Sequence, residues 1–307
     1  MPPENLALLA ALTTSVVFGI SDALWKIPLR IFSPESCIFI RNIGTTLFLG
    51  ITAFFAKKAV IFNSEAFFYG VLISFLSFFG LYFFGKSQQY SKVSLIAPLL
   101  IVGSFITFLI GVFYFGESAN TTKWLCFCLC LVGTFLISFQ GNNYQKNNEN
   151  DKKGIKYGFL AAVFWGVSYS FFRESTLKLG VATFGFILEA TILIMSGLVI
   201  GFSKLFFKNQ LKKEENQPEN QEENQPKTSK QKALFSLLFI AFLGSVGVYC
   251  SNLGCEAVPV SSMVIMGTFG NIIPVFAGKI FYKEQISRQQ YAGIVLQITA
   301  LAVFKLV

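Results

Sequence analysis

Residues 80–124 read GLYFFGKSQQYSKVSLIAPLLIVGSFITFLIGVFYFGESANTTKW, and a related stretch occurs a second time in the chain. The second copy covers residues 247–291 at a constant offset of 167, without a gap. The identical positions include three glycines inside apolar runs, and they are the pairs Gly80/Gly247, Tyr82/Tyr249, Val93/Val260, Ser94/Ser261, Gly103/Gly270, Gly111/Gly278 and Glu117/Glu284. A repeat of this length predicts that the chain contains two structurally equivalent units.

The composition predicts a membrane protein. Hydrophobic residues make up 53% of the 307 residues and charged residues only 13%, whereas soluble domains are about 25% charged. The net charge of +9 comes from lysines that gather between apolar runs, which favours a membrane surface over nucleic acid. The six cysteines have no spacing that predicts a disulfide framework.

Spanning helices need about 20 apolar residues, because roughly 30 Å of hydrocarbon is crossed at 1.5 Å per residue. The chain has about ten such segments, at residues 5–24, 36–56, 66–85, 93–115, 124–140, 156–172, 181–203, 233–252, 258–281 and 289–306. Small residues within them, such as Gly103, Gly111 and Gly267, are expected to let helices approach closely. We therefore predict an all-α integral membrane protein.

A second repeated block lies near the start of each half. Residues 18–21 (FGIS) match residues 165–168 (WGVS) at an offset of 147. The difference between the two offsets fits inside a polar stretch, residues 204–232, that contains EENQP twice. We predict a disordered Gln-, Glu-, Asn- and Lys-rich loop there, at about 206–231. The predicted units are residues 1–142 and 143–307, with five spanning helices each.

The odd number of helices in each unit has a geometric consequence. A unit that crosses the membrane five times ends on the side opposite to where it began, so the second unit must be inverted relative to the first. Inverted repeats are typical of secondary carriers, whose substrate site lies near the bilayer midplane between the two halves.

Several motifs resemble the EamA-type repeats of the drug/metabolite transporter superfamily. Phe18-Gly19-Ile20-Ser21 followed by Lys26, and Trp165-Gly166-Val167-Ser168 followed by Arg173, resemble its W-G-x-N/S…K opening. Pro34 with Arg41 resembles the P…R-F start of its second helix. Gly116-Glu117 with Trp124 resembles its G-E…Q-W-x-G segment, which Lys283-Glu284 and Tyr291 repeat in the second half.

The chain also departs from the family pattern. Phe18 stands where Trp is usual, Asp22 where an apolar residue is common, and Lys283 is the partner of Gly116. The resemblance covers the whole chain except the Gln-rich loop, and it implies transport of small metabolites without ATP. It implies no single substrate.

Charged side chains inside spanning segments are the first candidates for substrate binding, because a charge in the membrane is costly. They are Asp22, Lys26, Arg41, Arg173 and Glu189. Asp22 and Lys26 are four residues apart and could neutralise each other. The three basic side chains could equally extend to the membrane surface, which short acids cannot do. Because the chain has no histidine, proton coupling would have to use such acids.

Aromatic and polar side chains are the second group of candidates. They are Tyr82, Trp165, Tyr169, Tyr249 and Asn271, of which Tyr82 and Tyr249 are equivalent in the repeat. Helix packing or a place in an interfacial aromatic belt is the alternative role for each of them. Glu117 and Glu284 are expected to be structural residues of the connecting turns.

We predict a secondary carrier of small metabolites, such as amino acids or related compounds, or of drugs. A channel or a lipid-handling protein is the alternative, and a membrane-embedded enzyme is the least favoured, since no catalytic or nucleotide-binding motif occurs. We expect no cofactor, no metal and no nucleic-acid partner. Protons are the candidate coupling ion, and the expected form is a monomer in the bacterial cytoplasmic membrane.

Two indicators of orientation disagree. The distribution of basic residues between loops favours both termini outside, whereas the family resemblance implies that both are cytoplasmic. The orientation stays open at this point.

Overall fold

The structure is a computed structural model that describes residues 2–56, 63–91, 96–138, 149–206, 229–273, 275–276, 279 and 286–306. The side chains of residues 97–98, 204–206, 271 and 305–306 lie outside this description. Most of the predicted loop at about 206–231 also lies outside it, as do Glu284 and Gly278.

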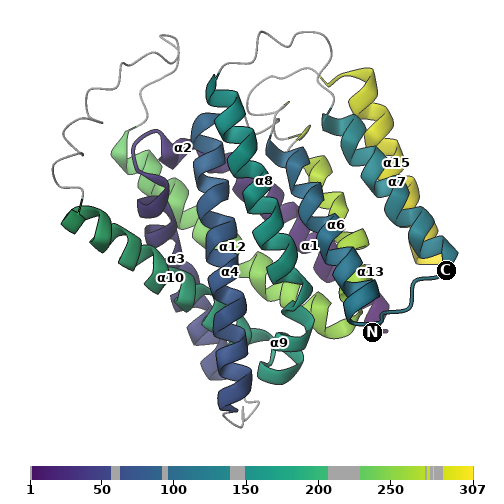
Figure 1. The fold of residues 1–307 in the computed structure, drawn as a ribbon, viewed down its shortest axis with the longest axis horizontal. Helices are drawn as coiled ribbons and strands as arrows, with labels where there is room; N and C mark the ends of the chain where they lie inside the picture. Colours follow the sequence, from purple (N-terminus) through teal and green to yellow (C-terminus); the bar gives the residue numbers. More distant parts are fainter. Residues whose placement is uncertain are drawn as a thin grey trace.

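The described chain is helical (Figure 1). Its first half contains α1 (Pro3–Leu24), α2 (Lys26–Leu29), α3 (Pro34–Phe55), α4 (Ser64–Tyr90), the 3-10 turn η1 (Ala97–Leu100), α6 (Ile101–Leu109), the π-helical turn η2 (Ile110–Tyr114) and α7 (Thr121–Ser138). Its second half contains α8 (Glu149–Ser170), α9 (Phe172–Leu179), α10 (Val181–Phe206), α12 (Lys230–Ala257), α13 (Val260–Gly267), the 3-10 turn η3 (Thr268–Asn271) and α15 (Arg288–Leu306). A helix therefore lies in each of the ten predicted segments.

The helix boundaries differ from the predicted ones where polar residues extend a helix beyond the apolar segment. α8 begins at Glu149, before the apolar segment predicted from residue 156, and α4 continues to Tyr90. Side-chain caps mark several helix starts, as expected where the first backbone N–H groups lack partners. Ser33 accepts a hydrogen bond from Ser36 N at the start of α3, and Asn63 accepts from Glu65 N and Ala66 N at the start of α4.

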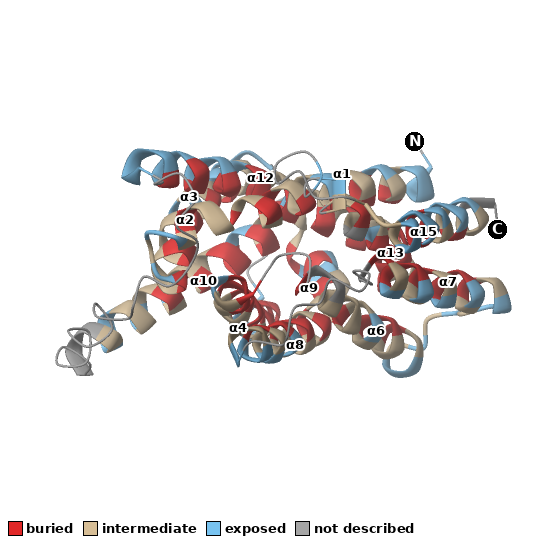
Figure 2. Cartoon of the chain, turned by 90° about the horizontal axis from the view of Figure 1, so that it is seen from above, coloured by how far each residue is buried: buried red, intermediate tan, exposed pale blue. Residues whose placement is uncertain are grey.

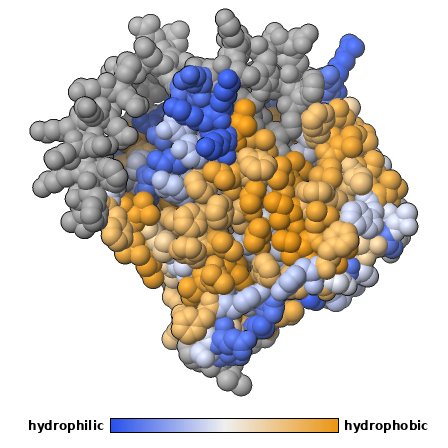
Figure 3. Space-filling view, in the orientation of Figure 1, coloured by the Kyte–Doolittle hydropathy of each residue, from blue (hydrophilic) through white to orange (hydrophobic). Residues whose placement is uncertain are grey.

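The surface is that of an integral membrane protein. Among the described residues, five helices are long and apolar enough to cross a membrane, and a sixth is if α8 and α9, bent by 42°, count as one span. Figure 3 shows a broad apolar band across the molecule, with hydrophilic surface above and below it. Large side chains such as Phe54 and Phe235 point outward. Lipid tails would cover such side chains, whereas water would not stabilise them.

The helices form two layers that each contain elements of both halves (Figure 2). One layer contains α3, α12 and α1, and the other contains α10, α4, α8 and α6. The helices α3 and α10 connect the layers at one end, and α7 and α15 pack together at the other. Each contact has a counterpart in the repeat: α1 packs on α12 as α8 packs on α4, and α12 packs on α3 as α4 packs on α10.

The two halves are inverted. In Figure 1, α1 leads into α2 near the top of the view, whereas its equivalent α8 leads into α9 at the bottom. This arrangement, together with the paired contacts, is what a pseudo-two-fold axis between the halves produces. The inverted five-helix repeat predicted from the sequence is therefore the architecture of the fold.

The duplicated motifs make the same helix contact twice. A Cβ atom added to Gly80 would lie 2.6 Å from Nε1 of Trp165, and one added to Gly247 would lie 2.5 Å from Cε1 of Phe18. Gly80 is equivalent to Gly247, and Phe18 is equivalent to Trp165. The glycines of one motif therefore receive the aromatic rings of the other, which explains why both recur in each half.

Glu117 joins the halves by capping a helix of the opposite one. Its Oε1 accepts a hydrogen bond from Val260 N at 2.8 Å, and its Oε2 accepts from Ser261 N at 2.9 Å and from the Ser261 hydroxyl. Pro259, the residue before α13, has no side chain that could cap these N–H groups. The predicted structural role of Glu117 agrees with this geometry, and the carboxylate also suits the positive end of the helix dipole.

We expect Glu117→Ala to lower the free energy of unfolding by about 1–3 kcal/mol, because it leaves the first N–H groups of α13 without an acceptor. The midpoint of thermal unfolding in detergent micelles measures this loss. Glu4→Ala is the control, since Glu4 is exposed in the first turn of α1. Equal midpoints for the two variants would contradict a capping role.

Candidate functional site

A cavity of about 340 Å³ lies between the two halves. Its walls come from four helices of the first half (α1, α3, α4 and α6) and their four equivalents in the second half (α8, α10, α12 and α13), together with the turns and short segments adjoining them. The helices α7 and α15 contribute no lining residue. The cavity therefore lies where inverted repeats place a substrate site.

The lining follows the repeat residue by residue. Many lining residues have their repeat equivalent on the opposite wall: Phe18/Trp165, Gly19/Gly166, Ser21/Ser168, Asp22/Tyr169, Trp25/Phe172, Arg41/Leu188, Leu81/Val248, Leu100/Gly267 and Gly103/Gly270. The positions that line the cavity are thus largely symmetric, although paired side chains differ in size, as at Leu100 and Gly267. The charge is not symmetric, because the equivalents of Asp22 and Arg41 are the uncharged Tyr169 and Leu188.

Aromatic rings and hydroxyl groups make up much of the cavity wall. The ring centroids of Tyr169 and Phe172 lie 4.9 Å apart, and the Tyr169 hydroxyl lies 3.0 Å from the Ser251 hydroxyl. Ser77 and Ser168 hydrogen-bond to each other across α4 and α8. A small molecule in the cavity would meet flat apolar faces and a few hydrogen-bonding groups, the usual composition of a ligand site.

Gly267 contributes open space to the cavity. An added Cβ atom would meet no atom within 4 Å, although Gly103 is in contact with the backbone of Ala162. The expectation that Gly267 serves close helix packing is therefore wrong, whereas it is correct for Gly103. The difference arises because a side chain added at Gly267 would point into open space beside the cavity, whereas the contact of Gly267 with α1 is made by its carbonyl, which accepts a hydrogen bond from Ser15 Oγ at 3.2 Å.

Asp22 lines the cavity from α1, where its carboxylate is half-buried. Within the described residues this carboxylate forms no hydrogen bond and no ion pair, and its interaction with Arg41 is one of electrostatic attraction only. The possible ion pair between Asp22 and Lys26 is not among the contacts of the described residues, although α1 and α2 together form one helical span, Pro3–Leu29.

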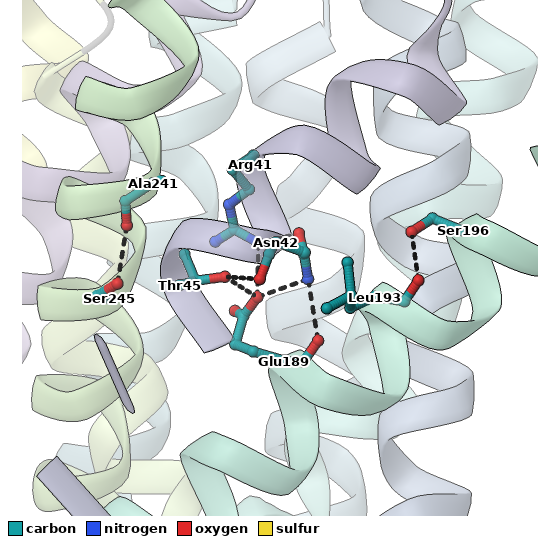
Figure 4. Close-up of polar contacts among 8 residues, drawn as sticks. All are labelled: Arg41, Asn42, Thr45, Glu189, Leu193, Ser196, Ala241 and Ser245. Carbon is teal, nitrogen blue, oxygen red and sulfur yellow. Dashed lines mark hydrogen bonds and ion pairs between the residues drawn. The ribbon is translucent and has the colours of Figure 1, made fainter. Parts of the chain in front are cut away.

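Glu189 and Arg41 form a buried ion pair between α10 and α3 (Figure 4). Arg41 Nη1 lies 2.9 Å from Glu189 Oε2, and their side chains are 8% and 2% exposed. The same Oε2 accepts hydrogen bonds from Asn42 Nδ2 at 2.7 Å and from Thr45 Oγ1 at 2.8 Å. One carboxylate oxygen thus has three donors, which satisfies a buried charge as burial requires.

The ion pair lies on the pseudo-two-fold axis. Asn42 and Glu189 are repeat equivalents at the offset of 147, and their side chains hydrogen-bond to each other. Equivalent residues can touch in this way only where the axis passes between them. Glu189 is therefore the charged counterpart of an uncharged amide in the other half.

The predicted site residues separate into two groups. Asp22, Arg41, Trp165, Tyr169 and Glu189 line the cavity. Asn271 has its backbone in η3 beside the lining residue Gly270, and its side chain lies outside the described part of the structure.

The other four predicted residues do not line the cavity. Arg173 donates from Nε to the carbonyl of Val258 at 3.2 Å, at the end of α12. Tyr82 packs beside Lys86, whose Nζ lies 5.6 Å from the ring centroid. Tyr249 is 37% exposed on α12, and Lys26 lies in α2.

Trp25, Phe172 and lining serines such as Ser77 and Ser251 were not predicted from the sequence. The offset of 147 pairs Trp25 with Phe172, and extending the comparison one turn beyond the FGIS and WGVS blocks would have found both. Asn42 and Thr45 were missed because a lone amide or hydroxyl in an apolar helix gives no signal for its distant partner.

No group of three or more potential metal ligands occurs in the described residues. Cys126 and Cys130 are buried in α7 and Cys128 is exposed, as the helical spacing predicts.

The comparisons with known proteins agree with this architecture. A model of the EamA-like transporter family matches residues 5–139 and, a second time, residues 152–306. A crystal structure, titled only as that of a protein, has a TM-score of 0.71 at 13% identity and covers 98% of this chain and 96% of its own. No curated protein matches the sequence. Because the family model matches both halves of the chain, the protein belongs to the EamA-like transporter family and is an integral membrane transporter of small molecules.

Proposed function

We propose that the protein is a secondary carrier of small metabolites, such as amino acids or related compounds, or of drugs, that works by alternating access. The observation that carries this proposal is the cavity between the halves, because more than half of its described lining residues form repeat-equivalent pairs. In such an arrangement the two halves can exchange conformations, so that the cavity opens first to one side and then to the other.

The contacts that would exchange are the paired ones. α1 packs on α12, and α8 packs on α4, through the same glycine and aromatic positions. Closing one pair while the other opens changes access without building a new interface. A cavity loaded in one state would then be emptied in the other.

Within this proposal the residues have different roles. Asp22, Trp165 and Tyr169 contact the substrate directly, since their side chains line the cavity. Arg41 and Glu189 hold α3 against α10 through their ion pair, and their charges contribute to the electrostatic potential at the substrate. We further propose protons as the coupling ion, a monomer as the working form, and the bacterial cytoplasmic membrane as the location.

Counterflow in proteoliposomes tests the proposal. Vesicles are preloaded with unlabelled L-phenylalanine, uridine, glucose or 2-phenylethylamine, and the uptake of the same compound with a label is measured. A carrier accumulates label transiently above equilibrium when it is preloaded, whereas a channel does not. Preloading that leaves the uptake of every transported compound unchanged would contradict a carrier.

We expect Gly267→Leu to lower the initial rate of counterflow by about tenfold, the effect of roughly 1.4 kcal/mol, because the new side chain would occupy the cavity. Unfolding temperature should change little, since an added Cβ meets no atom within 4 Å. Gly201→Leu is the matched control, because Gly201 also has no neighbour within 4 Å but lies on an exposed face of α10. Equal rates in the two variants would contradict the assignment of this cavity as the route.

A further inference from the structure

We propose that the cavity selects organic monocations, amines with an apolar or aromatic body, and that Asp22 is their counter-ion. This inference rests on the proposed function and specifies its substrate class. It follows from the balance of charge in the cavity and from the partners that each charged group already has.

The described lining contains three charged residues, Asp22, Arg41 and Glu189. When all three are ionised, one positive and two negative charges leave one net negative charge in a largely apolar enclosure. An uncompensated charge inside a membrane protein is costly, and a proton or a bound organic cation at Asp22 removes that cost. The missing partner is therefore positive.

Arg41 is not available as the positive partner of Asp22. Its Nη1 donates to Glu189 Oε2 at 2.9 Å and to Asn42 Oδ1 at 3.0 Å, and both partners are buried. Moving the guanidinium to Asp22 would leave the Glu189 carboxylate buried without its positive partner. Such a loss typically costs several kcal/mol. Arg41 thus attracts Asp22 without pairing with it.

The other titratable group in the lining is Tyr169, whose hydroxyl is engaged with Ser251 at 3.0 Å. The lining residues of α4, α12, α13 and η3 are uncharged. The repeat equivalent of Asp22 is Tyr169 itself, so the second half supplies no second carboxylate at this level. In the described lining, Asp22 is the carboxylate that has no guanidinium paired with it, because Arg41 pairs with Glu189.

The walls near Asp22 suit the rest of such a molecule. Phe18 lies one turn before Asp22 on α1, and Trp25, Trp165 and Phe172 also line the cavity. Aromatic faces attract cations and bury apolar groups. The same lining offers little to an anion, because the one guanidinium is already paired.

Equilibrium binding to the purified protein in lipid nanodiscs tests this inference with four compounds that share one ring and differ in charge. They are 2-phenylethylamine (cation), 2-phenylethanol (neutral), L-phenylalanine (zwitterion) and phenylacetate (anion). We expect 2-phenylethylamine to bind about tenfold or more tightly than each of the others, since a charge-assisted contact is worth about that factor.

Three variants show whether Asp22 is the cause. Asp22→Asn should lower the affinity for the amine to that for the alcohol, and Asp22→Glu should retain part of the preference. Glu189→Gln frees Arg41 while keeping an acceptor for Asn42 and Thr45, so the preference for the cation should shrink and binding of the zwitterion should rise. Glu174→Gln is the control, because Glu174 lies outside the cavity on α9 and contacts Tyr69 and Lys178.

A preference for the zwitterion or the anion, an unchanged preference in Asp22→Asn, or no binding of any of the four compounds would each overturn the proposal. Failure of the carrier function is a separate result. If the protein binds the amine through Asp22 but gives no counterflow with it, the cation site is supported and the carrier function is contradicted. If the protein gives counterflow of another compound and does not prefer cations, the carrier function is supported and the cation site is contradicted.

Discussion

Glu189→Ala is expected to lower the free energy of unfolding by about 3–5 kcal/mol, which makes it the most destabilising single change that the polar interior offers. The variant would leave Arg41, only 7% exposed, without its ionic partner. It would also remove the acceptor shared by Asn42 and Thr45. Thermal unfolding in detergent micelles, followed by the loss of helical circular dichroism, measures the change.

The matched experiment removes both charges. Arg41→Met with Glu189→Leu should recover most of the stability that Glu189→Ala loses, because the buried guanidinium that lost its carboxylate is then absent as well. Glu174→Ala, which breaks the more exposed ion pair with Lys178, should cost about 1 kcal/mol or less. A double variant as unstable as Glu189→Ala would mean that the loss does not come from the unpaired guanidinium.

Gly80→Val is expected to lower the free energy of unfolding by about 1–3 kcal/mol and to lower counterflow as well. A Cβ at this position would lie 2.6 Å from Nε1 of Trp165, so the ring has to move. Because Trp165 also lines the cavity, the displacement reaches the substrate site. We therefore expect this variant to lose both packing between α4 and α8 and transport activity.

The repeat provides an internal comparison for this prediction. Gly247→Val should behave similarly, since its Cβ would lie 2.5 Å from Cε1 of Phe18. Gly201→Val makes the same change in helix propensity at a position where an added Cβ meets no atom within 4 Å. It should therefore lower the free energy of unfolding less than the other two variants. If all three variants lost equal stability, the effect would be one of propensity and not of the glycine–aromatic contact.

Paired lining positions with an asymmetric charge are the main feature of the cavity. The scaffold positions Phe18 with Trp165 and Gly19 with Gly166 are matched, so both halves can make equivalent contacts in two states. Asp22 and Arg41 have uncharged equivalents in the second half, and Glu189 has the uncharged Asn42 as its equivalent in the first. The charges in the cavity therefore do not follow the repeat, although many of the lining positions do.

Much of the fold was predictable from the sequence. The two offsets, 147 and 167, together with apolar segments long enough to span a bilayer, predicted the all-α membrane fold and the inverted five-helix units. The glycines of the duplicated stretch predicted close helix approach, and this holds at Gly103 but not at Gly267. Half of the ten candidate residues line the cavity, since charge in an apolar segment is a good indicator of a polar interior.

The class, the repeat and the inversion follow from hydropathy and from spacing along the chain, so they can be predicted without the structure. Which charges meet depends on how the helices pack in three dimensions. Arg41 forms its ion pair with Glu189, 148 positions away, and among the described residues Asp22 has only the electrostatic attraction of Arg41. An ion pair depends on the distance between the two charges in space. Packing across the repeat, and not either charge, places α3 against α10.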